Sequence, residues 1–343
     1  MSLKQSAFLT YVACAVLATA PLSAQESATN DEAVTRPVIS EDISPLVRIG
    51  PIATDGYQGE GFLRRPPGEG PFPAVVLIHG GLSRLPTEVI RQFALRPYAS
   101  RFLEAGYVVA VITYRSRDRD PASQSPQAIA DALAAVDYVK SLPYVDPSSV
   151  VVNGSSGGGD LTLEVAAATD VAAIAPEEPA SLLMAGIFTA DLAAEFAERI
   201  ATILAAGGGG RGRGRGRGGA MTVDDLLGDT DLVQLYAEAG ENETLTEKVA
   251  RIRSPILIIQ GGALSGLNRF NEEIVVPTLQ KAGKSVEVRT YPGEVHGFAF
   301  NDRSERPAMV LRAFEDIDAF FRRHLQTQPS PIDPVLVEHL SLR

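Results

Sequence analysis

The chain has 343 residues, 45% of them apolar, which is enough to bury a sizeable core in one large domain or two small ones. Its formal net charge of -11 argues against nucleic acid as the main partner. The four histidines and the single cysteine, Cys14, show neither a His-x-x-x-His nor a paired-cysteine spacing. We therefore predict no disulfide and no dedicated transition-metal site.

The first 24 residues have the layout of a secretory signal peptide. Lys4 precedes a mostly apolar stretch from Ala7 to Leu22, and Leu22-Ser23-Ala24 then stands before polar residues. The alternative is an N-terminal membrane anchor, because the apolar stretch approaches the ~18 residues that a spanning helix requires. We predict cleavage after Ala24, export to the periplasm or the cell exterior, and no stable membrane association afterwards. Residues 25–44 are polar and form a predicted N-terminal tail.

The next part of the chain alternates strand and helix patterns. Two short strands are predicted at 46–53 and 57–65, around the turn signal Asp55-Gly56. Continuous apolar runs, typical of a parallel sheet covered on both faces, follow at 74–78, 107–112, 150–152, 171–175, 255–260 and 286–291. Helices are predicted at 126–141, 157–169, 271–282 and 306–325. This order predicts the α/β class, with a doubly wound and mostly parallel sheet.

The strand pattern is interrupted between residues 175 and 255. Helices are predicted at 180–206 and 221–239, separated by a Gly/Arg tract at 207–219. We interpret 180–253 as a helical lid inserted into one domain that spans 45–327, with 328–343 as a C-terminal tail. The arginines of the tract could clamp an anionic polymer or a membrane. Alternating glycine favours a solvated loop instead, because it prevents the arginines from being held in one geometry.

A G-x-S-x-G motif follows the apolar strand at 150–152 and precedes a helix-forming stretch, as a nucleophile elbow requires. The tight turn needs positions without bulk two residues before and after the serine. Gly154 and Gly158 meet this need when the motif is centred on Ser156, whereas centring on Ser155 would put Asn153 on the strand side. A phosphate-binding loop would need Lys-Ser or Lys-Thr after the last glycine, and the chain has Asp-Leu there. Ser156 is therefore the predicted nucleophile.

A serine nucleophile needs a base that titrates near neutrality, and histidine is the natural candidate. His296 follows the last predicted strand, in a loop flanked by Gly293 and Gly297. His324 and His339 lie in or beyond the last predicted helix, where solvent exposure is the simpler explanation. We therefore predict that His296 is the general base.

His79-Gly80-Gly81 follows the predicted strand at 74–78 and suggests an oxyanion hole. Acyl transfer needs two backbone donors for the tetrahedral oxyanion. We expect them to be the N–H group of Gly157 and that of Gly81 or Leu82. The alternative is that the two glycines only form a turn.

Three motifs resemble the α/β-hydrolase superfamily, near its dienelactone hydrolase and prolyl-oligopeptidase-like branches. They are the strand followed by His-Gly-Gly, the elbow at Ser156 and the Tyr-Pro-Gly-x-x-His-Gly-Phe segment at the end of the domain. The likeness runs from about Pro73 to Arg322. It implies Ser156 as nucleophile, His296 as base and the chain order serine, acid, histidine. Dienelactone hydrolases carry cysteine at the elbow. The roughly fifty residues between the predicted cleavage site and Pro73 cannot form the propeller of a prolyl oligopeptidase.

These departures favour hydrolysis of small carboxylic esters through an acyl-enzyme, which needs no cofactor. A serine peptidase of the oligopeptidase type is one alternative. A binding protein that has lost its catalytic acid is another.

The acid of the predicted triad is missing from its usual place, since the superfamily usually carries it after the next-to-last strand. The corresponding loop, 260–268, contains no carboxylate. Glu177 and Glu178 follow the predicted strand at 171–175, where some lipases of the superfamily carry their acid. We favour this pair, and Glu178 first, because Pro179 would fix its backbone. The alternatives are Glu272, Glu273, Glu294 and a site without an acid.

Overall fold

The computed structural model describes residues 44–117, 121–205, 223–240, 243–262, 265–302 and 304–333. The predicted signal peptide, nearly all of the N-terminal tail, the Gly/Arg tract and the chain after residue 333 lie outside the described residues, so those predictions stay predictions. No helix within the described ranges is both long and apolar enough to cross a membrane.

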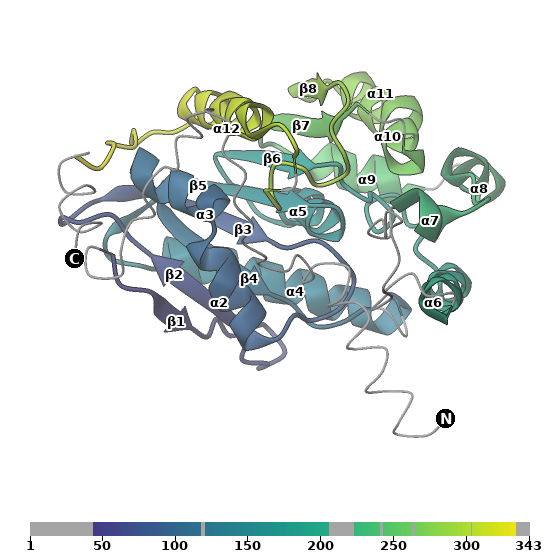
Figure 1. The fold of residues 1–343 in the computed structure, drawn as a ribbon, viewed down its shortest axis with the longest axis horizontal. Coiled ribbons are helices and arrows are strands. Elements are labelled where there is room, and N and C mark those ends of the chain that lie inside the picture. The colour runs from purple at the N-terminus through teal and green to yellow at the C-terminus, as the bar shows by residue number, and fades with distance from the viewer. Residues whose placement is uncertain are drawn as a thin grey trace, which may run out of the picture.

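The core of the fold is one eight-stranded sheet (Figure 1), whose strand order is β1-β2-β4-β3-β5-β6-β7-β8. The pairs from β4 through β3 to β8 are parallel, and β1 and β2 add an antiparallel edge. The predicted doubly wound, mostly parallel sheet is therefore confirmed. The strands are β1 (Val47–Ile49), β2 (Glu60–Arg64), β3 (Phe72–Ile78), β4 (Val108–Thr113), β5 (Val145–Ser155), β6 (Ala173–Glu177), β7 (Ile256–Gly261) and β8 (Val286–Tyr291).

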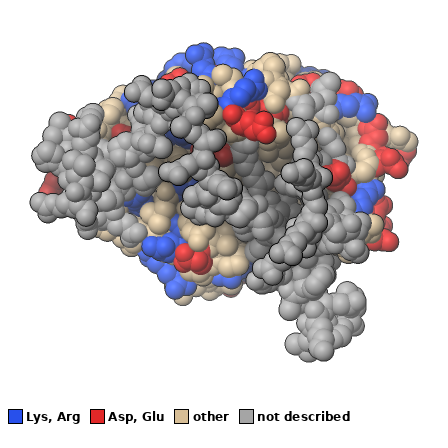
Figure 2. Space-filling view, in the orientation of Figure 1, with Lys and Arg blue, Asp and Glu red and all other residues tan. Residues whose placement is uncertain are grey.

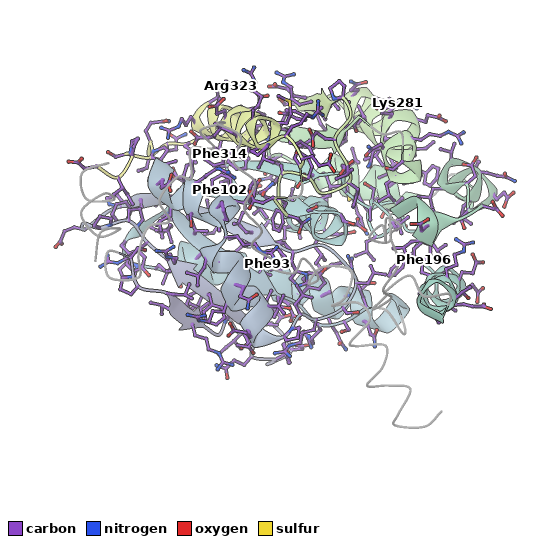
Figure 3. All side chains as sticks on the ribbon, viewed as in Figure 1. Phe93, Phe102, Phe196, Lys281, Phe314 and Arg323 are labelled. Carbon is purple, nitrogen blue, oxygen red and sulfur yellow. The ribbon has the colours of Figure 1, made fainter. Side chains whose placement is uncertain are left out.

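Helices cover both faces of this sheet. In β3, Val75 and Leu77 point to a core shared with α2, α3 and α12, whereas Val76 and Ile78 point to a core shared with α4 and α5. Figure 3 shows Phe102 of α3 beside Phe314 of α12, and their ring centroids are 4.9 Å apart. The helices are α2 (Thr87–Leu95), α3 (Pro97–Ala105), α4 (Pro121–Lys140), α5 (Gly157–Ala168), α6 (Ala190–Ala205), α7 (Val223–Leu227), α8 (Leu232–Glu238), α9 (Glu243–Arg251), α10 (Gly266–Phe270), α11 (Val276–Lys281) and α12 (Pro307–Arg322), with a π-helical turn at Asn271–Val275.

Strand β6 runs two residues later than the predicted strand at 171–175. The predicted strand ended at Ala175, before Pro176, a residue that has no N–H to donate to a sheet. The pairing with β5 nevertheless continues past this proline, with Pro176 opposite Gly154 and Glu177 opposite Ser155. Glu177 is therefore the last residue of a central strand and does not lie in the loop after it.

The predicted helix at 180–206 is wrong over its first ten residues, since α6 begins at Ala190. Asp160 accepts hydrogen bonds from the Leu183 and Met184 amides and holds this segment in an irregular turn. Ser181 has a φ of 57° and Gly186 a φ of 71°, which a helix does not contain.

The predicted helix at 221–239 is also wrong as a single helix. It divides into α7 and α8 because Gly228 has a φ of 54° and the Asp231 side chain caps the start of α8. Helix α9 follows and was not predicted. In Figure 1, α6, α7 and α8 stand together at the right-hand end of the molecule.

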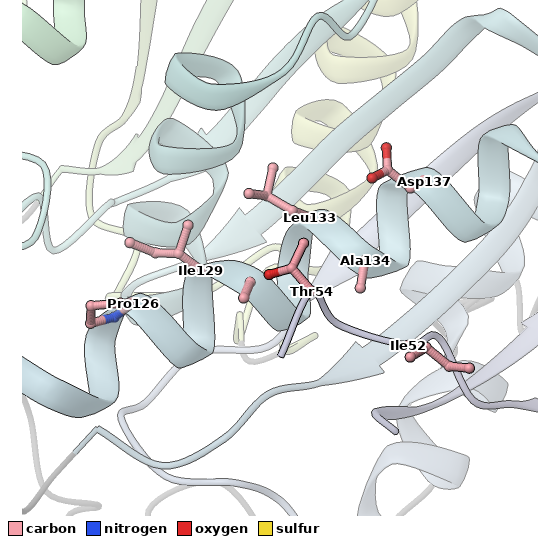
Figure 4. Close-up of a pocket in the computed structure, with 8 residues that line it drawn as sticks. Ile52, Thr54, Pro126, Ile129, Leu133, Ala134 and Asp137 are labelled. Atoms are coloured by element: carbon pink, nitrogen blue, oxygen red, sulfur yellow. The ribbon is translucent and has the colours of Figure 1, made fainter. Parts of the chain in front are cut away.

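Figure 2 shows basic and acidic side chains intermixed over the described surface of one face. A pocket of about 290 Å³ lies between α4 and the segment around Ile52 and Thr54 (Figure 4). Its lining includes none of the predicted catalytic residues, so it does not contribute to the site described next.

Candidate active site

The elbow lies where β5 ends and α5 begins, at the carboxyl ends of the parallel strands. Ser156 has a φ of 54° and a ψ of -117°, a strained conformation for a residue with a side chain. A Cβ on Gly154 would lie 2.4 Å from the Gly158 carbonyl oxygen, and a Cβ on Gly158 would lie 2.2 Å from the Ile78 carbonyl oxygen. Both glycines are therefore required by close backbone approach, which places the turn at Ser156 and leaves Ser155 as the last strand residue.

The backbone of Ser156 fixes the elbow against its neighbours. Its N–H donates to the Glu177 carbonyl oxygen over 2.9 Å, and its own carbonyl accepts from the Asp160 and Ala180 amides. These bonds connect the elbow to the end of β6, and the residue that follows this end is Glu178.

Glu178 lies against His296. Its Oε2 is 3.1 Å from Nδ1 of His296, and the two side chains are 1% and 21% exposed, respectively. Neither ring nitrogen of His296 forms a hydrogen bond of good geometry among the described residues, so the Nδ1 approach to Glu178 is a close contact between a nitrogen and a carboxylate oxygen. The nitrogen that faces away from the carboxylate is thus left for another proton donor or acceptor, which is the arrangement a general base needs.

The carboxylate of Glu178 is held by three further donors. Oε2 accepts from the Gly297 amide over 2.6 Å, and Oε1 accepts from the Gly261 amide and from Nδ2 of Asn268, both over 3.0 Å. Burial opposes ionisation, but His296 and these donors outweigh it and hold the pKa of Glu178 below its ordinary value. Glu178 also has a φ of 41°, so its backbone is strained as that of Ser156 is.

Asn268 contacts Glu178 and was not among the predicted site residues. It lies in α10, within the segment 260–268 where an acid was expected, and it donates to Glu178. The missing carboxylate of that segment was the available signal, because a carboxylate that reaches it from the end of β6 is better matched by a neutral donor than by a second negative charge.

Glu177 occupies a different place from Glu178. Its two oxygens accept from the Ala299 and Phe300 amides, each over 2.9 Å, in the segment just after His296. Burial and the neighbouring Glu178 raise the pKa of Glu177 to about 8. It therefore holds the backbone that follows His296. No contact between Glu177 and the His296 ring occurs among the described residues.

The three alternative acids all have other partners in the described structure. Glu272 accepts from the Gln260 side chain, Glu273 pairs with Arg269, and Glu294 pairs with Arg306. The geometry therefore favours Glu178 among the carboxylates that the sequence offered.

His79 is a buried residue with polar partners on both ring nitrogens. Nδ1 lies 2.7 Å from the Gly80 carbonyl oxygen, and Nε2 lies 3.1 Å from Oγ1 of Thr113. The ring stacks on Tyr114, and burial lowers the pKa of His79 to about 4. The residue is thus neutral at pH 7 and supports the loop that it begins.

The predicted oxyanion donors come together beside the elbow. A Cβ on Gly157 would lie 2.1 Å from the Gly81 carbonyl oxygen, so the two backbones are in direct contact. Gly81 has a φ of 90°, a conformation that glycine adopts readily. The amides of Gly81, Leu82 and Gly157 donate no hydrogen bond within the described part of the chain. They are therefore available to an oxyanion.

A search of solved structures finds the same architecture in known hydrolases. The carboxylesterase EstE1, cloned from a metagenomic library, superposes with a TM-score of 0.57 at 20% identity and covers 86% of this chain and 92% of its own. The chain has the α/β-hydrolase fold. The sequence model of the BD-FAE family matches residues 63–182, from β2 past the elbow to the loop after Glu178.

Two curated proteins match parts of the chain. The quorum-quenching protein AidA of Acinetobacter baumannii (strain MDR-ZJ06) is 34% identical over 112 residues, which is 31% of this chain. Acylamino-acid-releasing enzyme 1 of Oryza sativa subsp. japonica is 23% identical over 266 residues, or 74% of this chain. The matches span 34% and 30% of these two proteins' own lengths.

Proposed function

We propose that this α/β-hydrolase cleaves carboxylic esters through an acyl-enzyme, with Ser156 as nucleophile, His296 as general base and Glu178 as the acid that orients it. The observation that carries the proposal is the contact between Glu178 and Nδ1 of His296, because it supplies the triad member that the usual loop lacks. A carboxylate there fixes the imidazole tautomer and stabilises the imidazolium that forms during turnover.

The reaction proceeds in two halves. The Ser156 oxygen attacks the ester carbonyl carbon while His296 takes the hydroxyl proton, and the oxyanion accepts hydrogen bonds from Gly157 and from Gly81 or Leu82. The tetrahedral intermediate collapses, and the alcohol leaves with the proton from His296. Water then attacks the acyl-enzyme with the same assistance, which releases the carboxylic acid and restores the serine.

The expected substrate is a small ester, and segment 180–253 is the proposed lid over its acyl and alcohol groups. Within this segment the structure describes α6 to α9. Lys248 of α9 ion-pairs with Glu164 of α5, the helix that starts at the elbow. Part of the insertion is therefore anchored to the element that carries the nucleophile.

The first test is the release of p-nitrophenol from p-nitrophenyl acetate and butyrate. The wild type should be faster than Ser156→Ala by at least about 10³-fold. Ser155→Ala is the matched control, because it removes the neighbouring buried hydroxyl without touching the proposed nucleophile. It should keep most of the wild-type rate. A wild type no faster than Ser156→Ala would instead favour a binding protein with a hydrolase fold.

A serine peptidase is the second candidate, favoured by the match to an acylamino-acid-releasing enzyme over 74% of the chain. It would use the same triad to cleave an amide. N-acetylalanine p-nitroanilide distinguishes the two candidates, because an esterase hydrolyses this anilide far more slowly than a matched ester. A kcat/KM for the anilide equal to or above that for p-nitrophenyl butyrate would establish the peptidase.

A further inference from the structure

Arg117 is a buried arginine next to the elbow. It follows β4 by four residues and is 0% exposed. Its Nη2 donates to the Gly157 carbonyl oxygen over 2.7 Å. Its Nε and Nη1 are also buried and have no hydrogen-bond partner in the part of the chain that the structure describes. Burying a charged group with unmet donors is unfavourable, so this placement requires a compensating role.

Arg117 contacts both backbone segments that carry the proposed oxyanion donors, and we call them the Gly157 arm and the Gly81-Leu82 arm. Its side chain donates to the Gly157 carbonyl oxygen. Its backbone N–H donates to the Leu82 carbonyl oxygen over 2.8 Å. Tyr114, three residues earlier, donates from its hydroxyl to the Gly81 carbonyl oxygen over 2.5 Å. One short segment after β4 therefore ties the Gly81-Leu82 arm to the Gly157 arm.

Among the described residues, Arg117 has no carboxylate at ion-pair distance. The buried carboxylates of Asp160 and Glu164 attract its charge from farther away, and the oxygens of Asp160 accept from the Leu183 and Met184 amides. A positive charge in such a dry environment acts strongly on a negative charge that develops a few ångströms away.

We propose that Arg117 is a positioning residue of the oxyanion hole, which holds the Gly157 and Gly81-Leu82 arms at a fixed separation and raises the positive potential between them. This inference rests on the proposed function, because it assigns Arg117 to the step in which the ester carbonyl becomes an oxyanion. It predicts that Arg117 contributes to the transition state and little to the binding of the ground-state ester.

The test compares Arg117→Gln and Arg117→Lys with Arg115→Lys as the matched control. Arg115 precedes Arg117 by two residues but pairs with Asp131 and Asp55, away from the elbow. With p-nitrophenyl butyrate, Arg117→Gln should lower kcat by about 10- to 100-fold and change KM by less than about threefold. Arg117→Lys keeps the charge and should recover part of the loss. Arg115→Lys should lower the unfolding midpoint and leave kcat close to the wild-type value.

An inhibitor that forms a tetrahedral adduct shows whether Arg117→Gln weakens binding of the transition state or only disturbs the structure in general. An alkyl trifluoromethyl ketone forms such an adduct with a nucleophilic serine. Its inhibition constant should weaken in Arg117→Gln by about the same factor as kcat. The inference is overturned if kcat falls no further than in Arg115→Lys, if KM rises with kcat unchanged, or if the ketone binds Arg117→Gln as tightly as it binds the wild type.

Hydrogen–deuterium exchange tests the positioning role without reference to activity. Amides in the peptide 79–84 should exchange faster in Arg117→Gln than in the wild type or Arg115→Lys, because the Gly81-Leu82 arm is then held less firmly. Unchanged exchange in this peptide would overturn the inference even if the wild type proves to be an active esterase. Ester hydrolysis by the wild type no faster than by Ser156→Ala would overturn the proposed function. In that case, faster exchange in the 79–84 peptide of Arg117→Gln would still show that Arg117 holds the two arms together.

Discussion

Replacing Glu178 by glutamine removes the proposed acid while keeping the size of the side chain. Each carboxylate oxygen of Glu178 faces two donors: the Gly261 amide and Asn268 on one side, and the Gly297 amide and His296 on the other. The glutamine NH₂ group must replace one of these oxygens. Turned toward Gly261 and Asn268, it meets two donors and leaves them without an acceptor. Turned toward Gly297 and His296, it leaves the Gly297 amide without an acceptor, whereas the imidazole can adopt the tautomer in which Nδ1 accepts.

The structure sets the magnitude of two separate effects. Each unmet buried donor destabilises a protein by about 1–3 kcal/mol, so Glu178→Gln should lose at least about 1–3 kcal/mol in the free energy of unfolding. The imidazole also loses the partner that fixes its tautomer, which lowers turnover by about 10⁴-fold, or about 5 kcal/mol in the activation barrier.

Glu177→Gln makes the same chemical change one residue earlier and serves as the control. Each oxygen of Glu177 accepts from one backbone amide, so the glutamine leaves one donor unmet and should lose about 1–3 kcal/mol in stability. Its kcat should fall by less than about tenfold. The assay is the hydrolysis of p-nitrophenyl butyrate by protein shown to be folded by circular dichroism. Equal loss of kcat in the two variants, or retained activity in Glu178→Gln, would refute the assignment of the acid.

Three further predictions concern stability. The pKa of Glu177 is raised from 4.5 to about 8, so the folded protein keeps a proton that the unfolded chain releases. The free energy of unfolding of the wild type, relative to Glu177→Gln, should therefore fall by about 1 kcal/mol per pH unit between pH 5 and 8, and a difference independent of pH in urea titrations would contradict this. Gly158→Ala should prevent folding or lose more than about 3 kcal/mol, because its Cβ would meet the Ile78 and His79 carbonyl oxygens at 2.2 and 2.3 Å. Gly283→Ala, with no atom within 4 Å of its Cβ but a φ of 70°, should lose only about 1 kcal/mol, and equal losses would exclude the steric explanation. Phe102→Ala should lose about 3–5 kcal/mol, since its ring packs against Tyr98, Tyr107, Phe314 and Phe321, and a chemical unfolding midpoint close to that of the wild type would show that the core repacks.

The sheet could be predicted because each strand is a local pattern. The apolar runs before the elbow and before His296 need no knowledge of distant residues, and all six predicted parallel strands are present. The boundary at Pro176 was missed because the continued pairing of β6 depends on its register with β5, which the local sequence does not encode.

The proposed acid, Glu178, was harder to predict because its position is determined by long-range contacts. Glu178 reaches His296 through a strained backbone at the end of β6, and it is held by Gly261 and Asn268, more than eighty residues away. The irregular turn before α6 has a similar cause, since Asp160 fixes it from another helix. Hydrophobic periodicity contains neither kind of information.

The central claim is that Ser156 is the nucleophile, and covalent labelling tests it most directly. An alkyl fluorophosphonate should add once to the wild-type chain, and mass spectrometry of the peptides should place the adduct on Ser156. The adduct should persist in Ser155→Ala and disappear in Ser156→Ala. An adduct on another residue, or none under conditions in which the protein hydrolyses p-nitrophenyl butyrate, would contradict the account.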